Sequence, residues 1–191
     1  MEKNIRKMVI ISVYAAIVII MTIIPFLGYI NYGTPIEATL IHIIVILAGL
    51  STGIWGGAIV GGVWGVTCLM RAFTSSAFLP FQNPLVSVLP RILVGIVAAL
   101  VFMLLSKKFK LNKIISAVFA AILGSATNTV FVIGMLNITG GTVDSKLIVE
   151  TFDMIINAWL TIQGAGELVL AAVVCPALYA AVNRVLSKEN I

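Results

Sequence analysis

The sequence predicts an all-α integral membrane protein with six transmembrane helices and both termini in the cytoplasm. Hydrophobic residues make up 61% of the 191 residues and charged residues only 10%, whereas a soluble domain typically carries about 25% charged residues. Six apolar runs are separated by short polar or basic connections, and a run of about 20 residues is long enough to cross a bilayer as a helix. We expect a single membrane domain over residues 1–191.

Proline, glycine and basic residues separate the expected spans. The spans cover residues 8–26, 35–51, 54–70, 85–106, 114–136 and 163–185. Pro25 ends the first span, Pro35 lies in the first turn of the second, where proline is tolerated, and Pro90 should kink the fourth span or mark a frayed start. An amphipathic segment over residues 147–162, which carries Trp159, is a candidate interfacial helix or an extension of the last span.

The basic residues predict the orientation of the bundle. With the N-terminus inside, nine of the 12 basic residues fall on the inner side: Lys3, Arg6, Lys7, Lys107, Lys108, Lys110, Lys113, Arg184 and Lys188. Arg71 and Lys146 fall in outer loops, where Arg71 is expected to be solvated at the end of its helix, and Arg91 lies within the fourth span. Positive charge accumulates in cytoplasmic loops, so topology explains the net charge of +5 better than nucleic-acid binding does.

Glycines recur every four residues at positions 49, 53, 57, 61 and 65. A spacing of four keeps residues near one helical face, where glycine lets another backbone approach closely. Gly49 belongs to the end of the second span and Gly53 to a cytoplasmic turn, so only Gly57, Gly61 and Gly65 form a continuous stripe. We expect this stripe to hold the third span tightly against its neighbours.

Four of the expected spans carry polar residues at a similar depth on the outer side. The candidate binding residues are His42, Arg91, Asn128, Gln163 and Glu167, together with Asn83 from the loop before the fourth span. At a rise of 1.5 Å per residue, the residues within the spans lie about 5–13 Å below the outer surface. Because ionisable groups at membrane depth are costly, they mark functional sites. This layer predicts a site for a small polar ligand that is open to the outside.

Each of these residues also has a structural interpretation. Arg91 and Glu167 could neutralise one another, as buried charges usually must, and this pairing is compatible with a ligand site. His42 alone is more often a hydrogen-bonded structural histidine, and Asn128 could join two helices. Trp64 is interpreted first as a packing residue, with stacking against a ligand as the alternative.

The sequence lacks the common motifs for ATP hydrolysis and for catalysis. No GxxxxGK[ST] segment is present, the single histidine excludes a site with paired histidines, and no serine lies in a GxSxG elbow. Cys68 and Cys175 lie in separate apolar runs and are predicted to be inert packing residues. We therefore predict a binding subunit with no metal or cofactor of its own, and an integral-membrane enzyme or a ligand-free scaffold are the alternatives.

Short segments in or beside each expected span carry a resemblance to a known family. They are Ile24-Pro-Phe-Leu-Gly-Tyr29, Ala38-Thr-Leu-Ile-His-Ile43, the glycine-rich third span, Leu89-Pro-Arg-Ile-Leu-Val-Gly95, Gly124-Ser-Ala-Thr-Asn-Thr129 and Gly164-Ala-Gly-Glu167. With these segments the chain resembles, over nearly its whole length, the substrate-binding S component of an energy-coupling factor (ECF) vitamin transporter. The segments are more similar to the pantothenate-type branch than to the riboflavin, folate or biotin branches.

The resemblance implies how the protein works and what it binds to. In that family, six helices in a bacterial cell membrane capture a vitamin from outside, and the loaded subunit joins a transmembrane coupling protein and two ATPases that use ATP. The subunit is thought to topple in the membrane to release its cargo. Small residues on the first helix contact the coupling protein, which here implies Ser12 and Ala16, with serine in place of the family's first alanine. The loops at about residues 28–35 and 71–84 would close the site.

Together these features predict a high-affinity vitamin-binding membrane subunit for pantothenate uptake. Pantothenate is an anion with hydroxyl and amide groups. Arg91 is expected to pair with its carboxylate. The expected hydrogen-bonding residues are His42, Asn128, Gln163 and Glu167. Another small water-soluble vitamin or precursor, such as pyridoxine, is the alternative, and a neutral ligand would make Arg91 structural.

Overall fold

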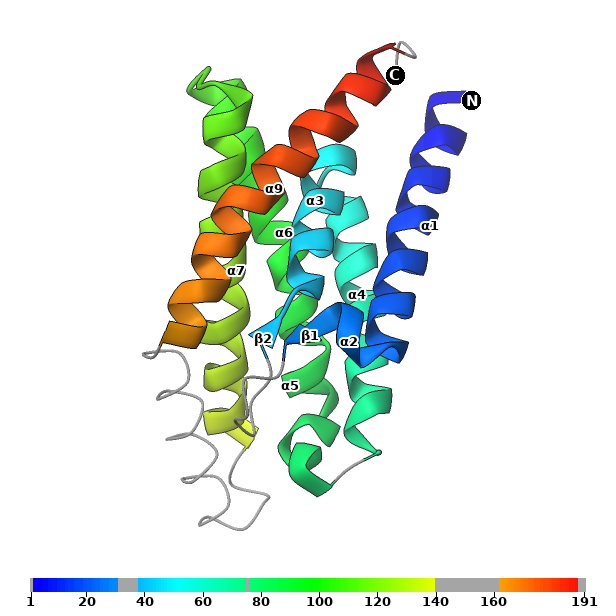
Figure 1. Cartoon of the computed structure of the whole chain (residues 1–191), viewed down its shortest axis with the longest axis vertical. Coiled ribbons are helices and arrows are strands. Elements are labelled where there is room, and N and C mark those ends of the chain that lie inside the picture. The colour runs from blue at the N-terminus through cyan, green and yellow to red at the C-terminus, as the bar shows by residue number, and fades with distance from the viewer. Residues whose placement is uncertain (1, 31–37, 75, 140–161, 189–191) are drawn as a thin grey trace.

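The computed structural model describes residues 2–30, 38–74, 76–139 and 162–188. These residues form a bundle of helices that run side by side (Figure 1). The long helices are α1 (Glu2–Ile23), α3 (Ile41–Thr52), α4 (Ile54–Ala72), α6 (Leu89–Met103), α7 (Lys113–Thr139) and α9 (Ile162–Lys188). Helix α1 begins and helix α9 ends at the same end of the bundle (Figure 1).

The all-α membrane class is confirmed by the length and composition of these helices. Among the described residues, five helical segments are long and apolar enough to cross a membrane: 4–23, 54–72, 84–108, 113–136 and 166–185. Helix α3 is also apolar but spans only 12 residues. Many large apolar side chains on the outside of the bundle are exposed, as expected of surfaces that face lipid.

The connection between α1 and α3 differs from the sequence prediction. Helix α1 ends at Ile23 rather than near residue 26, and the short helix α2 (Pro25–Gly28) follows it. Strands β1 (Tyr29–Ile30) and β2 (Ala38–Thr39) then pair antiparallel. The second expected span therefore begins later than predicted, at Ile41, because this pairing engages the backbone of residues 38–39. Residues 31–37, where the predicted start at Pro35 falls, lie outside the described residues.

The fourth expected span is divided close to Pro90, as predicted. Helix α5 (Pro84–Ser87) and helix α6 are separated at Val88, and Pro90 lies in the first turn of α6. Proline is tolerated there because the first N–H groups of a helix have no intrahelical partner. Before α5, the 3₁₀ segment η1 (Ser76–Gln82) follows α4, and after α6 the π-helical turn η2 (Leu104–Lys108) completes the span.

Helices α7 and α9 follow the last two predicted spans closely. Helix α7 continues to Thr139, slightly beyond the expected end at residue 136, and α9 runs from Ile162 to Lys188. Most of the candidate interfacial helix at residues 147–162, including Trp159, lies outside the described residues.

The glycine stripe packs against the backbone of α6, as the sequence predicts. A Cβ atom added at Gly57 would lie 2.5 Å from the carbonyl oxygen of Gly95, and one added at Gly61 would overlap the carbonyl group of Arg91. Gly65 meets the start of α6 in the same way, 2.6 Å from the Cα atom of Val88. Helices α4 and α6 therefore touch backbone to backbone, and this contact fixes the position of the turn that carries Arg91.

The remaining glycines of the series have the separate roles that the sequence indicated. Gly49 lies near the end of α3 and packs against α6, since an added Cβ would lie 2.8 Å from the carbonyl oxygen of Gly95. Gly53 joins α3 to α4 with φ of 88°, a left-handed conformation that glycine adopts without steric cost.

Substitution of two adjacent glycines on α4 tests the backbone contact. Gly61→Ala should lower the free energy of unfolding by about 1–3 kcal/mol, the usual cost of overpacking, because the new methyl group meets the Arg91 carbonyl. Gly62→Ala is the matched control, since its Cβ would meet only the Ile92 side chain at 3.7 Å. Thermal unfolding of the purified proteins in detergent measures the difference, and equal stabilities of the two variants would contradict the packing described here.

Candidate functional site

Several polar side chains are buried with atoms that have no hydrogen-bond partner in the described part of the chain. They are His42 with both ring nitrogens, Trp64 with Nε1, Arg91 with Nε, Ser125 with Oγ and Asn128 with Oδ1. Buried polar groups in folded proteins are nearly always hydrogen-bonded. These five residues come from α3, α4, α6 and α7, and we call them the polar cluster. Their unsatisfied atoms indicate a place where a ligand or water supplies the missing partners.

Arg91 is the cation of the polar cluster. It lies in the first turn of α6, only 8% exposed, and its guanidinium group donates a hydrogen bond of 2.7 Å to the carbonyl oxygen of Val86 in α5. The guanidinium carbon lies 5.3 Å from the ring centre of Trp64 and 5.8 Å from that of Phe81, within the range of cation–π attraction. The group is thus oriented before any ligand arrives, and its Nε–H remains available.

His42 lies in the first turn of α3, because this helix begins at Ile41. The predicted position of His42 was about one turn deeper, in a longer helix. Its side chain is 2% exposed, and neither ring nitrogen has a hydrogen-bond partner among the described residues. The backbone of Thr39 also interacts with the imidazole, so a structural role and a ligand-binding role both fit this histidine.

Ser125 and Asn128 lie three residues apart on α7 and so share one side of the helix. Helix α7 approaches α3 and α6 closely at Gly124, where an added Cβ would lie 3.0 Å from the side chain of Ile46 and 3.2 Å from that of Ala98. Asn128 follows Gly124 by four residues, so it projects from the same face. This geometry directs the two polar side chains toward the helices that carry His42 and Arg91.

Trp64 and Ser125 were not predicted as hydrogen-bonding residues of the site. Trp64 is 1% exposed and was interpreted first as a packing residue. Ser125 lies in the segment of residues 124–129 and was given no role of its own. The sequence signal for Trp64 is its position one residue before Gly65. The close approach of α4 and α6 at that glycine brings the indole beside Arg91.

Glu167 is engaged with the strand that precedes α3. Its Oε1 atom accepts a hydrogen bond of 2.8 Å from the backbone N–H of Thr39. Among the described residues no ion pair joins Glu167 to Arg91, whose guanidinium group donates to Val86 instead. Mutual neutralisation of the two charges, the alternative interpretation, is thus not observed.

The two remaining candidate residues, Asn83 and Gln163, lie at the starts of helices α5 and α9. Asn83 caps helix α5, where its side-chain oxygen accepts a hydrogen bond of 3.0 Å from the backbone N–H of Leu85. Such a cap satisfies one of the free N–H groups at a helix start. Gln163 lies in the first turn of α9, and its side chain lies outside the described residues.

Arg71 joins the connections that follow α1 and α4. Its guanidinium carbon lies 4.0 Å from the ring centre of Tyr29 in β1 and 5.0 Å from that of Phe78 in η1. The prediction that Arg71 is solvated is wrong, because these two rings cover it and leave it half-buried.

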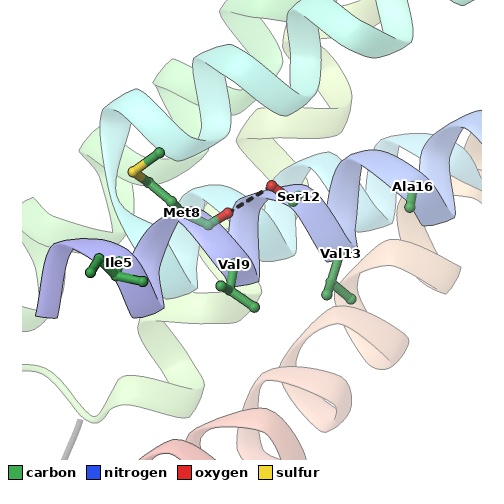
Figure 2. A pocket seen from close by; sticks show the side chains of 6 residues that line it. All are labelled: Ile5, Met8, Val9, Ser12, Val13 and Ala16. Atoms are coloured by element: carbon green, nitrogen blue, oxygen red, sulfur yellow. Dashed lines mark hydrogen bonds between the residues drawn. The ribbon is translucent and has the colours of Figure 1, made fainter. Parts of the chain in front are cut away.

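Helix α1 presents a shallow apolar groove on the outside of the bundle (Figure 2). It is lined by Ile5, Met8, Val9, Ser12, Val13 and Ala16. The Ser12 hydroxyl donates a hydrogen bond of 2.9 Å to the carbonyl oxygen of Met8, as Figure 2 shows. The hydroxyl is therefore satisfied within its own helix, and the two small residues Ser12 and Ala16 leave room for a partner to approach.

Comparison with known proteins agrees with this architecture. Residues 6–179 match the family described as ECF transporter, substrate-specific component. The "Pantothenate transporter PanT" of Leuconostoc mesenteroides subsp. mesenteroides is 35% identical over 146 residues, which cover 72% of this chain and 71% of the relative. The "Pantothenic acid transporter PanT" of Lactococcus lactis subsp. cremoris is 25% identical over 191 residues, 92% of each chain. The chain therefore belongs to the family of substrate-specific components of ECF transporters.

Proposed function

We propose that this protein is the vitamin-binding membrane subunit of an ECF importer and that its vitamin is pantothenate. Two relatives carry that substrate in their names. The observation that carries the proposal is the buried cation Arg91, whose Nε–H has no partner among the described residues, together with unsatisfied polar atoms on α3, α4 and α7.

The polar cluster matches the chemistry of pantothenate group by group. Arg91 supplies a charge-assisted donor for the carboxylate, and such bonds are roughly twice as strong as neutral ones. Trp64 adds an N–H donor, Asn128 a carbonyl acceptor, and Ser125 and His42 can each donate and accept. A ligand that carries a carboxylate, hydroxyl groups and an amide can satisfy all of them. Glu167 and Gln163, at the start of α9, are additional candidate contacts.

A neutral vitamin such as pyridoxine fits the polar cluster less well. It would leave the buried Arg91 guanidinium without a counterion among the described residues, and an uncompensated buried charge is strongly destabilising. An anionic ligand supplies the missing counterion, and the removal of this cost then adds to its binding free energy. Membership of a transport family also favours a transport subunit over an integral-membrane enzyme.

We propose further that the chain crosses the membrane six times, with both termini in the cytoplasm. The start of α1, the end of α9 and the basic turn between α6 and α7 all lie at one end of the bundle (Figure 1). The 12 residues of α3 extend only about 18 Å, less than the bilayer core. The β1–β2 hairpin occupies the outer remainder, and non-helical backbone at membrane depth is tolerated where it borders a protein-lined site.

Partner subunits would supply the energy for transport. We propose that the groove on α1 docks a transmembrane coupling protein and that two ATPase subunits of the same assembly use ATP. Ser12 and Ala16 are the small residues that permit this contact. The chain itself is proposed to bind the vitamin and no other cofactor.

Removal of the buried cation should abolish tight pantothenate binding. Arg91→Ala is expected to weaken binding by about 30-fold or more, the usual effect of truncating one partner of a buried charge pair. The alcohol analogue of pantothenate, in which a hydroxymethyl group replaces the carboxylate, provides a control ligand. It should bind the unaltered protein weakly and lose little on Arg91→Ala. Isothermal titration calorimetry on the purified protein measures both, and unchanged pantothenate affinity of the variant would refute the role of Arg91.

The indole N–H of Trp64 can be tested separately from its ring. Trp64→Phe keeps an aromatic ring near Arg91 but removes the donor, so pantothenate affinity should fall by about tenfold, as expected for a lost hydrogen bond of roughly 1.4 kcal/mol. Trp55→Phe is the control, because Trp55 is 82% exposed on the outside of the same helix. Equal affinities of the two variants would show that Trp64 only packs.

Enlarging the groove residues should separate transport from binding. Ala16→Trp is expected to leave pantothenate affinity within about twofold but to reduce uptake of labelled pantothenate by at least about tenfold in cells that carry the complete transporter, because one filled groove prevents close helix contact. Val173→Trp alters an exposed position of α9, which contributes no residue to the groove lining, and should have little effect. Normal uptake by Ala16→Trp would place the docking surface elsewhere.

A further inference from the structure

We propose that Arg71 is a positioning residue for the vitamin site. It holds Tyr29, and through the β1–β2 hairpin it fixes the backbone that anchors Glu167 and starts α3. Its contacts with Tyr29 and Phe78 lie outside the polar cluster, so we infer an indirect effect on binding. This inference rests on the proposed function, because it concerns the affinity of the same site.

The first link is the contact between Arg71 and the two rings. Arg71 lies in the last turn of α4, a helix held rigidly against α6 by its glycines. Its guanidinium carbon is 4.0 Å from the Tyr29 ring centre and 5.0 Å from the Phe78 ring centre. The Tyr29 hydroxyl also lies 3.7 Å from the Sγ atom of Cys68, one turn earlier on α4. Strand β1 is therefore fastened to α4 at two points.

The second link is the register of the hairpin. Tyr29 lies directly opposite Thr39, and Ile30 lies opposite Ala38. The backbone N–H of Leu40 donates a hydrogen bond of 2.8 Å to the carbonyl oxygen of Gly28, which extends the pairing by one residue. A pairing of only two residues per strand depends on the other contacts that each strand makes, because an isolated two-stranded hairpin is marginally stable.

The third link joins the hairpin to the site. The backbone N–H of Thr39 donates to Glu167 Oε1 at 2.8 Å, and the Thr39 hydroxyl accepts a hydrogen bond of 3.3 Å from the backbone N–H of Ile41. One residue therefore anchors the carboxylate of α9 and accepts a hydrogen bond from the first residue of α3. His42, with both ring nitrogens unsatisfied, follows immediately. A displacement of Tyr29 would thus shift both Glu167 and His42.

The energetic consequence is a loss of preorganisation. If the hairpin leaves its register for part of the time, only the remaining fraction of molecules can bind. The apparent dissociation constant is the intrinsic one divided by that fraction, so it rises as the fraction falls. A residue that merely supports the fold would instead lower the unfolding temperature without a matching change in affinity. The two roles can therefore be separated by experiment.

Binding of pantothenate to the purified full-length protein tests the proposal. Arg71→Ala and Tyr29→Leu should each weaken binding by about tenfold, because either change removes the cation–π contact that holds β1 against α4. Arg71→Lys and Tyr29→Phe keep a cation and a ring, and they should bind within about threefold of the unaltered protein. Phe73→Leu is the control, because Phe73 lies just beyond Arg71 and is 66% exposed.

Two further measurements establish that the effect passes through the hairpin. Hydrogen exchange of the ligand-free protein should show about tenfold faster exchange of the segment that contains Thr39 in Arg71→Ala. In a double-mutant cycle, Tyr29→Leu and Glu167→Gln should together weaken binding by less than the product of the single effects, as coupled residues do.

The outcomes separate this inference from the proposed function. If the unaltered protein does not bind pantothenate, the proposed function fails, and the inference fails with it. If the unaltered protein binds but Arg71→Ala and Tyr29→Leu bind within about twofold of it, only the positioning role is refuted. Multiplying effects in the double-mutant cycle, or unchanged exchange at Thr39, would also refute that role. If Arg71→Ala does not fold, pantothenate binding by Tyr29→Leu tests the same role.

Discussion

The backbone contact between α4 and α6 is the constraint on which the rest of the structure depends. Gly57 and Gly61 allow the two helices to touch along their carbonyl groups, and no side chain separates them there. Arg91 is part of that contact, so its guanidinium group starts from a fixed backbone. Trp64, on the opposing helix, then lies beside it. Helix packing thereby orients a buried cation that has no counterion in the described part of the chain.

The sequence predicted the long helices well because apolar length and glycine spacing are local signals. Helix α4 agrees with its predicted span to within two residues, and the stripe packs as expected. The start of the second span could not be predicted, because residues 38–39 are apolar enough for a helix and pair instead with residues 29–30. That choice depends on partners about ten residues away, which a local pattern does not contain.

The site was predicted in part for a similar reason. Arg91, His42 and Asn128 stand out in the sequence because charged or polar groups at membrane depth are costly. Trp64 and Arg71 do not stand out: a tryptophan in an apolar helix resembles any packing residue, and an arginine at a helix end resembles a solvated one. The buried indole nitrogen and the two rings around the guanidinium become evident only in the structure.

The same backbone contact limits how the site can change its selectivity. Residues on α4 and α6 cannot move apart or together, since glycine already gives the shortest approach that two helices can make. Their side chains are therefore poor places to accommodate a longer or bulkier vitamin. Ser125 and Asn128 lie on α7, which meets α3 and α6 at Gly124 through the side chains of Ile46 and Ala98 rather than through backbone. Redesign of the protein for another cargo should begin with these two residues, while the cation and its scaffold are retained for recognition of a carboxylate.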